Sequence, residues 1–150
     1  MAASNASCCE PACPLCAAAG ETLLWSGRHA RVVWVDDAAH PGYCRVIWAA
    51  HVKEMTDLSA TERTHLMGLV FAVESAVRTA FQPDKINLAS LGNLVPHLHW
   101  HVIPRYAEDP EFPNAIWGPQ ERPARPIARG SREVLATGLV QALAELSAEV

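Results

Sequence analysis

Three short runs near the start of the chain either alternate apolar with polar residues or are dense in β-branched and aromatic ones. Residues 21–27, 30–36 and 43–49 form these runs, and Arg45 stands between apolar neighbours in the third. Such composition favours β-strands, and the glycine, proline and aspartate residues between the runs favour turns. The pattern predicts three consecutive strands.

Longer runs with a period of three to four residues predict two helices. Ser59 and Glu62 form a capping box at the start of the first, which is expected to end before Gln82. Its apolar stripe consists of Leu66, Leu69, Val70, Val73 and Val77. The second helix covers residues 131–150. Its apolar face consists of Leu135, Leu139, Ala142 and Leu146.

Residues 85–91 and 97–104 predict two further strands, with a hairpin-type turn at Gly92-Asn93. The order β-β-β-α-β-β-α predicts an α+β fold, with a mainly antiparallel five-stranded sheet and two helices in one domain over residues 1–150. Residues 1–20 show no periodicity and predict an N-terminal arm. Residues 104–130 predict an irregular segment, because six of the eleven prolines lie between residues 104 and 126.

Composition narrows the class of protein further. The 150 residues are 50% hydrophobic and 19% charged with a net charge of −4, as in a packed globular protein. Without a block of Lys and Arg we expect no binding to nucleic acid, and without a long apolar run we expect no membrane span. The N-terminus lacks the pattern of a secretory signal, so a cytoplasmic location is expected.

The most informative residues are His97, His99 and His101. Alternate side chains of a strand share one face, so these three imidazoles are expected on one face of the fifth strand. Three interpretations are open: surface histidines, a strip of metal ligands, or nucleophilic or acid–base chemistry on an anionic group. A single metal site is disfavoured, because three such positions spread over about 13 Å.

The run from His97 to Ile103 resembles the signature of the histidine-triad superfamily of nucleotide hydrolases and transferases. Pro96 and Pro104-Arg105 flank it as in bacterial members related to diadenosine tetraphosphate hydrolases. Upstream, Pro41-Gly42, His51 and Asp57-Leu58-Ser59 are similar to another stretch of the family. The resemblance covers roughly residues 13–106.

The resemblance implies covalent catalysis with the three histidines as catalytic residues and without a required metal cofactor. His99 would attack the α-phosphorus of a small-molecule nucleotide, and water would release a nucleoside monophosphate from the nucleotidyl-histidine. The backbone carbonyl of His101 would hold the other nitrogen of His99, the His101 side chain would contact phosphate, and His97 would steady the site or a metal. A non-catalytic nucleotide-binding module is the alternative on the same fold.

The resemblance also suggests substrate-binding residues. Asn87 and Asn93 stand where relatives place amides near the phosphate and the leaving group, and Asp36 where they place a ribose-binding group. Asn93 and Asp36 equally suit plain turns. The chain departs from the family at Tyr43, in place of a histidine, and at Leu94, in place of a hydroxyl residue. These departures leave phosphoramidase activity in doubt.

Four of the five cysteines lie close together near the N-terminus: Cys8, Cys9, Cys13 and Cys16. In some triad relatives an N-terminal CxxC holds zinc together with two histidines, and the matching residues here are Cys13, Cys16, His51 and His97. The alternative is a pair of free thiols on the arm. Relatives are commonly homodimers, and Phe71 widens the apolar side of the first predicted helix, so a homodimer is expected.

Overall fold

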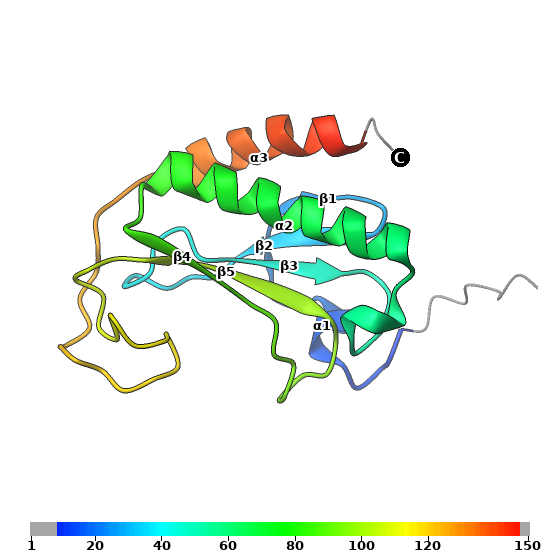
Figure 1. Ribbon diagram of the computed structural model, residues 1–150, viewed down its shortest axis with the longest axis horizontal. Coiled ribbons are helices and arrows are strands. Elements are labelled where there is room, and N and C mark those ends of the chain that lie inside the picture. Colours follow the sequence, from blue (N-terminus) through cyan, green and yellow to red (C-terminus); the bar gives the residue numbers. More distant parts are fainter. Residues whose placement is uncertain (1–8, 148–150) are drawn as a thin grey trace, which may run out of the picture.

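The protein folds around a five-stranded sheet, shown in the computed structural model of Figure 1, which describes residues 9–147. The strands follow the order β1-β2-β3-β5-β4, and every neighbouring pair is antiparallel. Their bounds are β1 Thr22–Ser26, β2 Ala30–Trp34, β3 Cys44–Trp48, β4 Lys85–Ala89 and β5 His99–Arg105. The predicted α+β class with an antiparallel sheet is confirmed.

Helices cover one face of this sheet. The long helix α2, Ala60–Phe81, packs on β3 and β5, and α3, Arg132–Ser147, lies beside α2 and contacts β1 (Figure 1). The predicted capping box is present, with Ser59 accepting from the Glu62 N–H and Glu62 accepting from the Ser59 N–H. It satisfies backbone donors that the first turn of a helix leaves free.

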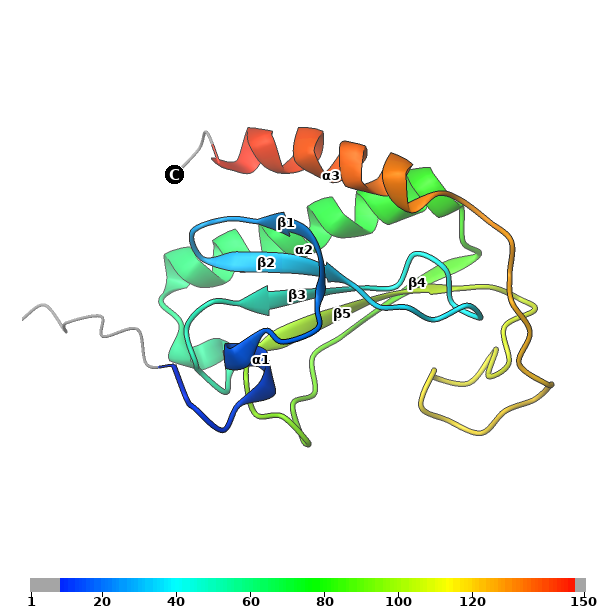
Figure 2. The same ribbon diagram turned by 180° about the vertical axis from the view of Figure 1, so that it is seen from behind.

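The alternation of side chains along β3 separates the two faces of the sheet. Cys44, Val46 and Trp48 point into the core beneath the helices. Arg45 therefore lies on the opposite face, where its partner across the strands is His101. This second face has no long helix over it. The short helix α1, Pro14–Ala17, and the segment between β5 and α3 lie at its two ends (Figure 2).

Two predicted details of the fold are wrong at the triad strand. The connection between β4 and β5 runs over residues 90–98 rather than through a two-residue turn, and β5 begins at His99 rather than His97. Pro96 has no N–H for a ladder, and the His97 N–H donates to the Val95 carbonyl instead. A turn therefore occupies the positions predicted as the start of the strand.

The number of helices also differs from the prediction. The described residues contain three α-helices rather than two, because part of the predicted arm forms α1. The 3-10 turn Met55–Asp57 adds a short element before α2. Cys8 and the rest of residues 1–8, like residues 148–150 of the predicted second helix, lie outside the described part. Of the predicted irregular segment 104–130, residues 104 and 105 belong to β5, and residues 106–130 contain neither helix nor strand.

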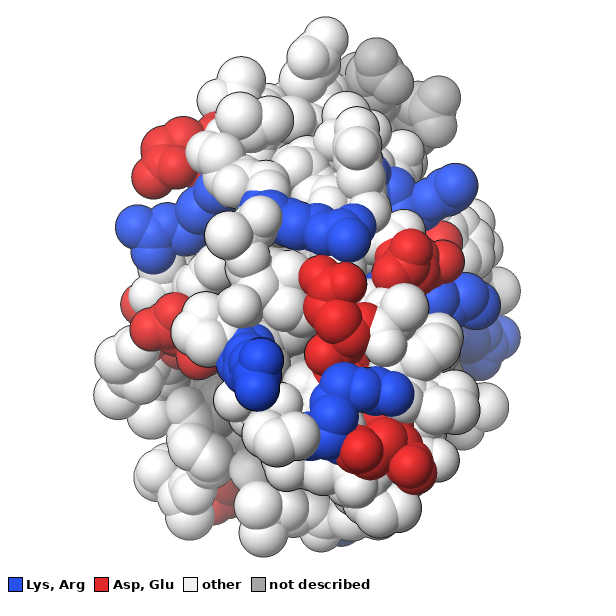
Figure 3. All heavy atoms as spheres, turned by 90° about the vertical axis from the view of Figure 1, so that its left-hand side faces the viewer, with Lys and Arg blue, Asp and Glu red and all other residues white. Residues whose placement is uncertain are grey.

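The surface at the end of the molecule where the segment between β5 and α3 lies carries both positive and negative side chains. Figure 3 shows Lys and Arg side chains interspersed with Asp and Glu on this face, rather than a patch of one sign. Along residues 9–147, no helix combines the length and the apolar character that crossing a membrane requires.

Candidate functional site

A cavity of about 390 Å³ opens on the sheet face that the helices leave free. His99 and His101 of β5 and Arg45 of β3 form its floor. Its walls include Leu15 of α1, Asn93 and Leu94 of the β4–β5 connection, and Trp117 of the proline-rich segment. Two triad histidines thus share a cavity of the size that small-molecule sites commonly have.

His99 is held in one tautomer by the backbone. Its Nδ1 lies 2.6 Å from the His97 carbonyl oxygen, which can only accept a hydrogen bond. Nδ1 therefore carries the hydrogen, and in the neutral ring Nε2 keeps its lone pair. The predicted partner, the carbonyl of His101, is wrong. His97 precedes the strand, and the ring of His99 reaches back to the carbonyl two residues before it.

His101 stacks edge-on against His99, with 4.9 Å between the ring centroids. Its Nδ1 lies 2.6 Å from the hydroxyl of Tyr43, the residue that replaces the expected family histidine. Burial, with smaller contributions from His99 and Arg45, lowers the pKa of His101 to about 4. Burial also raises the pKa of Tyr43. Near neutral pH both groups are uncharged, and the tyrosine O–H can donate to Nδ1, which leaves Nε2–H of His101 as a donor.

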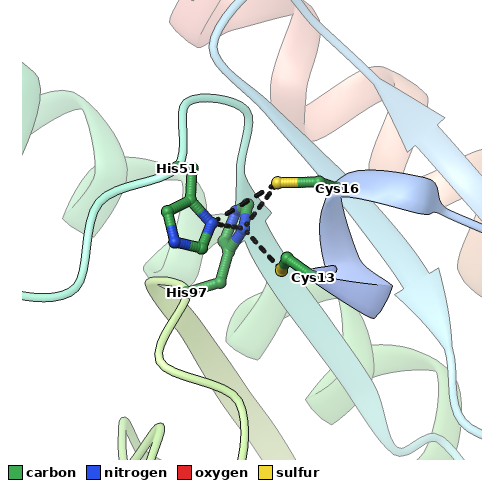
Figure 4. A group of neighbouring side chains, drawn as sticks. All are labelled: Cys13, Cys16, His51 and His97. Carbon is green, nitrogen blue, oxygen red and sulfur yellow. Dashed lines mark hydrogen bonds between the residues drawn. The ribbon is translucent and has the colours of Figure 1, made fainter. Parts of the chain in front are cut away.

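His97 faces away from the other two histidines. Its Nε2 donates to the Trp48 carbonyl at 2.7 Å, so Nδ1 keeps its lone pair. Burial lowers the pKa of His97, which favours the neutral ring. The Nδ1 atom points at the sulfurs of Cys13 and Cys16 and at Nδ1 of His51 (Figure 4). Sequence reasoning placed the three imidazoles on one face, whereas the structure divides them between two sites.

Cys13, Cys16, His51 and His97 form what we call the thiol–imidazole cluster, whose ligand atoms all lie within 4.8 Å of one another. Nδ1 of His97 lies 3.5 Å from both sulfurs, Nδ1 of His51 lies 3.4 Å from the sulfur of Cys16, and the two Nδ1 atoms lie 3.3 Å apart. Tetrahedral Zn²⁺ with usual bond lengths would place sulfur and nitrogen about 3.5 Å apart and two nitrogens about 3.3 Å apart. The donor set and its spacing therefore fit zinc.

The cluster connects three separate parts of the chain. Its cysteines lie in and next to α1, His51 follows β3, and His97 precedes β5 (Figure 4). Burial raises the pKa of Cys16 to about 11, so a cation is needed to keep this sulfur ionised near neutral pH. The Trp48 carbonyl on Nε2 of His97 orients the ring in the way that outer partners orient metal-binding histidines.

The predicted substrate-binding residues are not all brought to the cavity. Asn93 lines it. Asn87 lies on β4, where its Oδ1 accepts a hydrogen bond from Arg105 at 2.8 Å, and Asp36 is exposed after β2. Neither Asn87 nor Asp36 lines the cavity.

Three residues that sequence reasoning did not assign to the site lie at it: Tyr43, Arg45 and Trp117. Arg45 faces His101 from β3, Tyr43 reaches it from the residue before β3, and the ring of Trp117 meets that of His101 edge-on at 5.1 Å. Sequence signals existed for two of them: Tyr43 replaces a histidine of the family motif, and Arg45 is a charged residue amid the apolar ones of a predicted strand. Trp117 arrives through an irregular segment whose path no periodicity reveals.

A second group of possible ligands lies near the start of β3. His40, Asp109 and Glu111, which we call the carboxylate–imidazole cluster, are all buried and within 4.8 Å of one another. His40 Nδ1 lies 3.0 Å from an oxygen of Asp37, and its Nε2 lies 3.1 Å from Glu111 Oε2. Asp109 accepts from the Arg105 guanidinium at 2.8 and 2.9 Å.

Comparison with known proteins identifies the family and the fold. A family model described as the HIT domain matches residues 21–108. The AP-4-A phosphorylase of Mycobacterium tuberculosis is 30% identical over 104 residues, which are 65% of this chain and 52% of that protein. The asymmetrical bis(5'-nucleosyl)-tetraphosphatase of Schizosaccharomyces pombe is 32% identical over 74 residues, 46% of this chain and 41% of that protein. The chain thus spans about half the length of the curated relatives that it matches.

Solved structures share the fold over most of the chain. A histidine triad protein from Bradyrhizobium japonicum is 28% identical, with a TM-score of 0.66 over 81% of this chain and 90% of its own. One from Marinobacter aquaeolei is also 28% identical, with a TM-score of 0.66 over 86% of this chain and 93% of its own.

Proposed function

The chain belongs to the HIT domain family, and on that basis we propose that it is a nucleotide hydrolase or transferase that cleaves its substrate at the α-phosphate through His99. The observation that carries the proposal is the 2.6 Å contact between Nδ1 of His99 and the His97 carbonyl. It leaves the Nε2 lone pair of a cavity-lining imidazole free to attack phosphorus.

Two displacements account for the reaction. In the first, Nε2 of His99 forms a bond to the α-phosphorus, the bond to the leaving group breaks, and the leaving group departs with the electron pair. In the second, water attacks the phosphorus, loses a proton and restores the neutral imidazole as the nucleoside monophosphate leaves. His101 supports both steps through Nε2–H, a hydrogen-bond donor to a phosphate oxygen, because the Tyr43 hydroxyl occupies its Nδ1.

The names of the relatives suggest the substrate class. One is a phosphorylase for AP-4-A and another a bis(5'-nucleosyl)-tetraphosphatase, so dinucleoside polyphosphates are the first substrates to test. The second nucleophile is either water or phosphate, because a tetraphosphatase transfers the nucleotidyl group to water and a phosphorylase transfers it to phosphate.

A panel assay tests the proposal. The protein is incubated with dinucleoside polyphosphates, nucleoside phosphoramidates and adenylylated donors, and monophosphate release is followed with and without added phosphate. We expect turnover of at least one substrate, and its loss in His99→Ala with nucleotide affinity kept within about tenfold. Turnover by His99→Ala near the wild-type rate would overturn the nucleophile. Tight nucleotide binding without any turnover would favour the non-catalytic module.

A metallohydrolase centred on the triad has little support. In the described part of the chain, His99 and His101 belong to no group of three close metal-ligand atoms, whereas His97 belongs to the thiol–imidazole cluster. We propose that this cluster holds one structural Zn²⁺. With four protein donors the ion would have no open position for substrate. It would stabilise α1 against the sheet, and no catalytic step needs it.

The assembly and location of the protein remain predictions. We propose a homodimer, supported by Phe71 on α2 and by Val134 and Val140 on α3, which are 55–58% exposed apolar side chains on the helical layer. A sedimentation mass of a single chain at micromolar concentration would contradict this. We also propose a cytoplasmic location.

A further inference from the structure

Arg45 occupies a position in the cavity that the proposed chemistry does not yet use. It is paired with His101 across β3 and β5, and its side chain lines the cavity beside both His99 and His101. The neighbouring position on the same face of β3 is Ile47, which is paired with His99. The guanidinium therefore stands one pair of side chains away from the proposed nucleophile.

The guanidinium of Arg45 lacks the protein partner that the other sheet arginines have. Its Nε–H is buried and donates to no protein acceptor, although the guanidinium lies close enough to the Tyr43 hydroxyl to oppose the rise in the pKa of that group. Arg31 makes two 2.7 Å hydrogen bonds to Glu21, and Arg105 binds Asp109 through two nitrogens. Among the side chains that the structure describes, no carboxylate forms an ion pair with Arg45. A partly buried cation with donors to spare is costly unless an anion completes its surroundings.

The charge of the cavity identifies the kind of anion. Apart from the two imidazoles, its lining consists of apolar residues, Gly92, Asn93 and Arg45. Among the described residues, Arg45 is thus the only lining side chain with a permanent charge, and no described acidic residue lines the cavity to oppose it. A planar guanidinium beside a potential nucleophile for phosphorus suits phosphate oxygens, which it can bind through two parallel hydrogen bonds.

We propose that Arg45 binds the phosphate oxygens of the substrate and makes the site selective for phosphorylated ligands over nucleosides. This inference rests on the proposed function for the identity of the ligand, but it concerns binding rather than turnover. It also assigns distinct tasks to two neighbouring side chains. His101 offers one neutral N–H donor, and Arg45 supplies the positive charge that balances the phosphate chain.

The proposal predicts which ligands depend on Arg45. Binding of AMP and of inorganic tripolyphosphate should depend on it, because both present phosphate oxygens. Binding of adenosine should not. Removal of a charge-assisted hydrogen bond weakens binding by about 10- to 100-fold, whereas an uncharged nucleoside should change by less than about twofold.

Calorimetric titration of these three ligands into purified protein provides the test. The variants are Arg45→Gln, which removes the charge, and Arg45→Lys, which restores charge without the planar fork and should recover part of the affinity. Arg132→Gln is the matched control, since it makes the same change of net charge at the exposed start of α3. Thermal melts of each variant confirm folding before the titrations are compared.

The outcomes separate this inference from the proposed function. A selective loss of AMP and tripolyphosphate affinity in Arg45→Gln supports it, even if the wild-type protein releases no monophosphate. Equal affinity of wild type and Arg45→Gln for AMP, with normal turnover, overturns it and leaves the proposed function intact. An equal loss of adenosine and AMP affinity also overturns it, because the residue would then act on the shape of the site rather than on phosphate.

Discussion

The thiol–imidazole cluster and the carboxylate–imidazole cluster both gather possible metal ligands within 4.8 Å, yet their donor atoms are in different states. In the first, the ligand atoms lie 3.3–3.5 Å from other members of the cluster. The second ring nitrogen of His97 is bound to a backbone carbonyl, which leaves its lone pair directed at the sulfurs. These donors are free to bind a cation.

The carboxylate–imidazole cluster already has a cation. Both oxygens of Asp109 accept from the Arg105 guanidinium, and they also accept from the backbone N–H groups of Tyr106, Glu111 and Phe112. Burial raises the pKa of Asp109, but the hydrogen bonds that its carboxylate accepts from Arg105 and from the backbone outweigh burial and hold the pKa below its usual value. The oxygens of Asp109 are thus committed to Arg105 and to the backbone, whereas His40 Nε2 and Glu111 Oε2, 3.1 Å apart, have no partner in hydrogen-bond geometry. Close ligand atoms make a metal site only where the lone pairs of every member are free.

Each cluster orders a segment that reaches the cavity. The cysteines lie in and beside α1, which contributes Leu15 to the cavity wall. Asp109 and Glu111 stabilise the first turns of the proline-rich segment, which later contributes Trp117. We therefore expect damage to either cluster to affect both stability and the shape of the site, but only the first to depend on metal.

The largest effect should come from breaking the buried ion pair. Asp109→Ala leaves the Arg105 guanidinium, which is 2% exposed, without its carboxylate, and should lower the free energy of unfolding by about 3–5 kcal/mol. Urea denaturation measures this change. Asp36→Ala is the control, because Asp36 is exposed and should shift stability by less than about 0.5 kcal/mol. Equal effects of the two variants would refute the role given to the pair.

The second-largest effect should come from removing zinc, which we expect to bind to the thiol–imidazole cluster and not to the carboxylate–imidazole cluster. Protein purified without chelators should contain one equivalent of Zn²⁺, and the loss of zinc by chelation should cost about 3 kcal/mol, or roughly 6–12 °C in Tm. The paired variant Cys13→Ser with Cys16→Ser should contain less than about a tenth of an equivalent. His40→Ala should keep the full equivalent. Two equivalents in the wild type, or loss of zinc in His40→Ala, would reverse the comparison.

A smaller effect on stability should come from the protonation of His101 in the cavity. The pKa of His101 is about 4 in the folded protein, below the value of 6.5 for a free imidazole. Because the unfolded chain binds more protons between these values, stability should fall as pH is lowered from about 6.5 to 4, by on the order of 2 kcal/mol. His101→Gln should flatten this part of the profile. Below about pH 4 both proteins should lose further stability as Asp109, whose pKa is also lowered, is protonated.

The fold could be predicted where one local signal determined an element. The capping box at Ser59 and the apolar stripe behind it gave α2, and the alternation in residues 43–49 gave β3. The resemblance of the triad and of Cys13, Cys16 and His51 to family motifs brought distant residues together correctly, because the match carries spatial information that periodicity lacks.

Several features of the site could not be predicted because they depend on tertiary contacts. The path of residues 90–98 follows from Pro96 and from the turn that His97 makes with Val95, so a two-residue hairpin was the wrong expectation. The approach of Tyr43 and Arg45 to His101 depends on the register of β3 against β5. The contact of His40 with Glu111 joins two irregular segments, which no pattern of apolar residues aligns.

The central claim is that Nε2 of His99 attacks the α-phosphorus, and the most direct test is to locate the covalent intermediate. A single turnover with the substrate found in the panel assay is stopped rapidly in alkali, where a phosphorus–nitrogen bond survives, and the peptides are mapped by mass spectrometry. The account predicts a nucleoside monophosphoryl group on His99 of the wild-type protein and none in His99→Ala. Turnover without an adduct on His99, or an adduct on another residue, would contradict it.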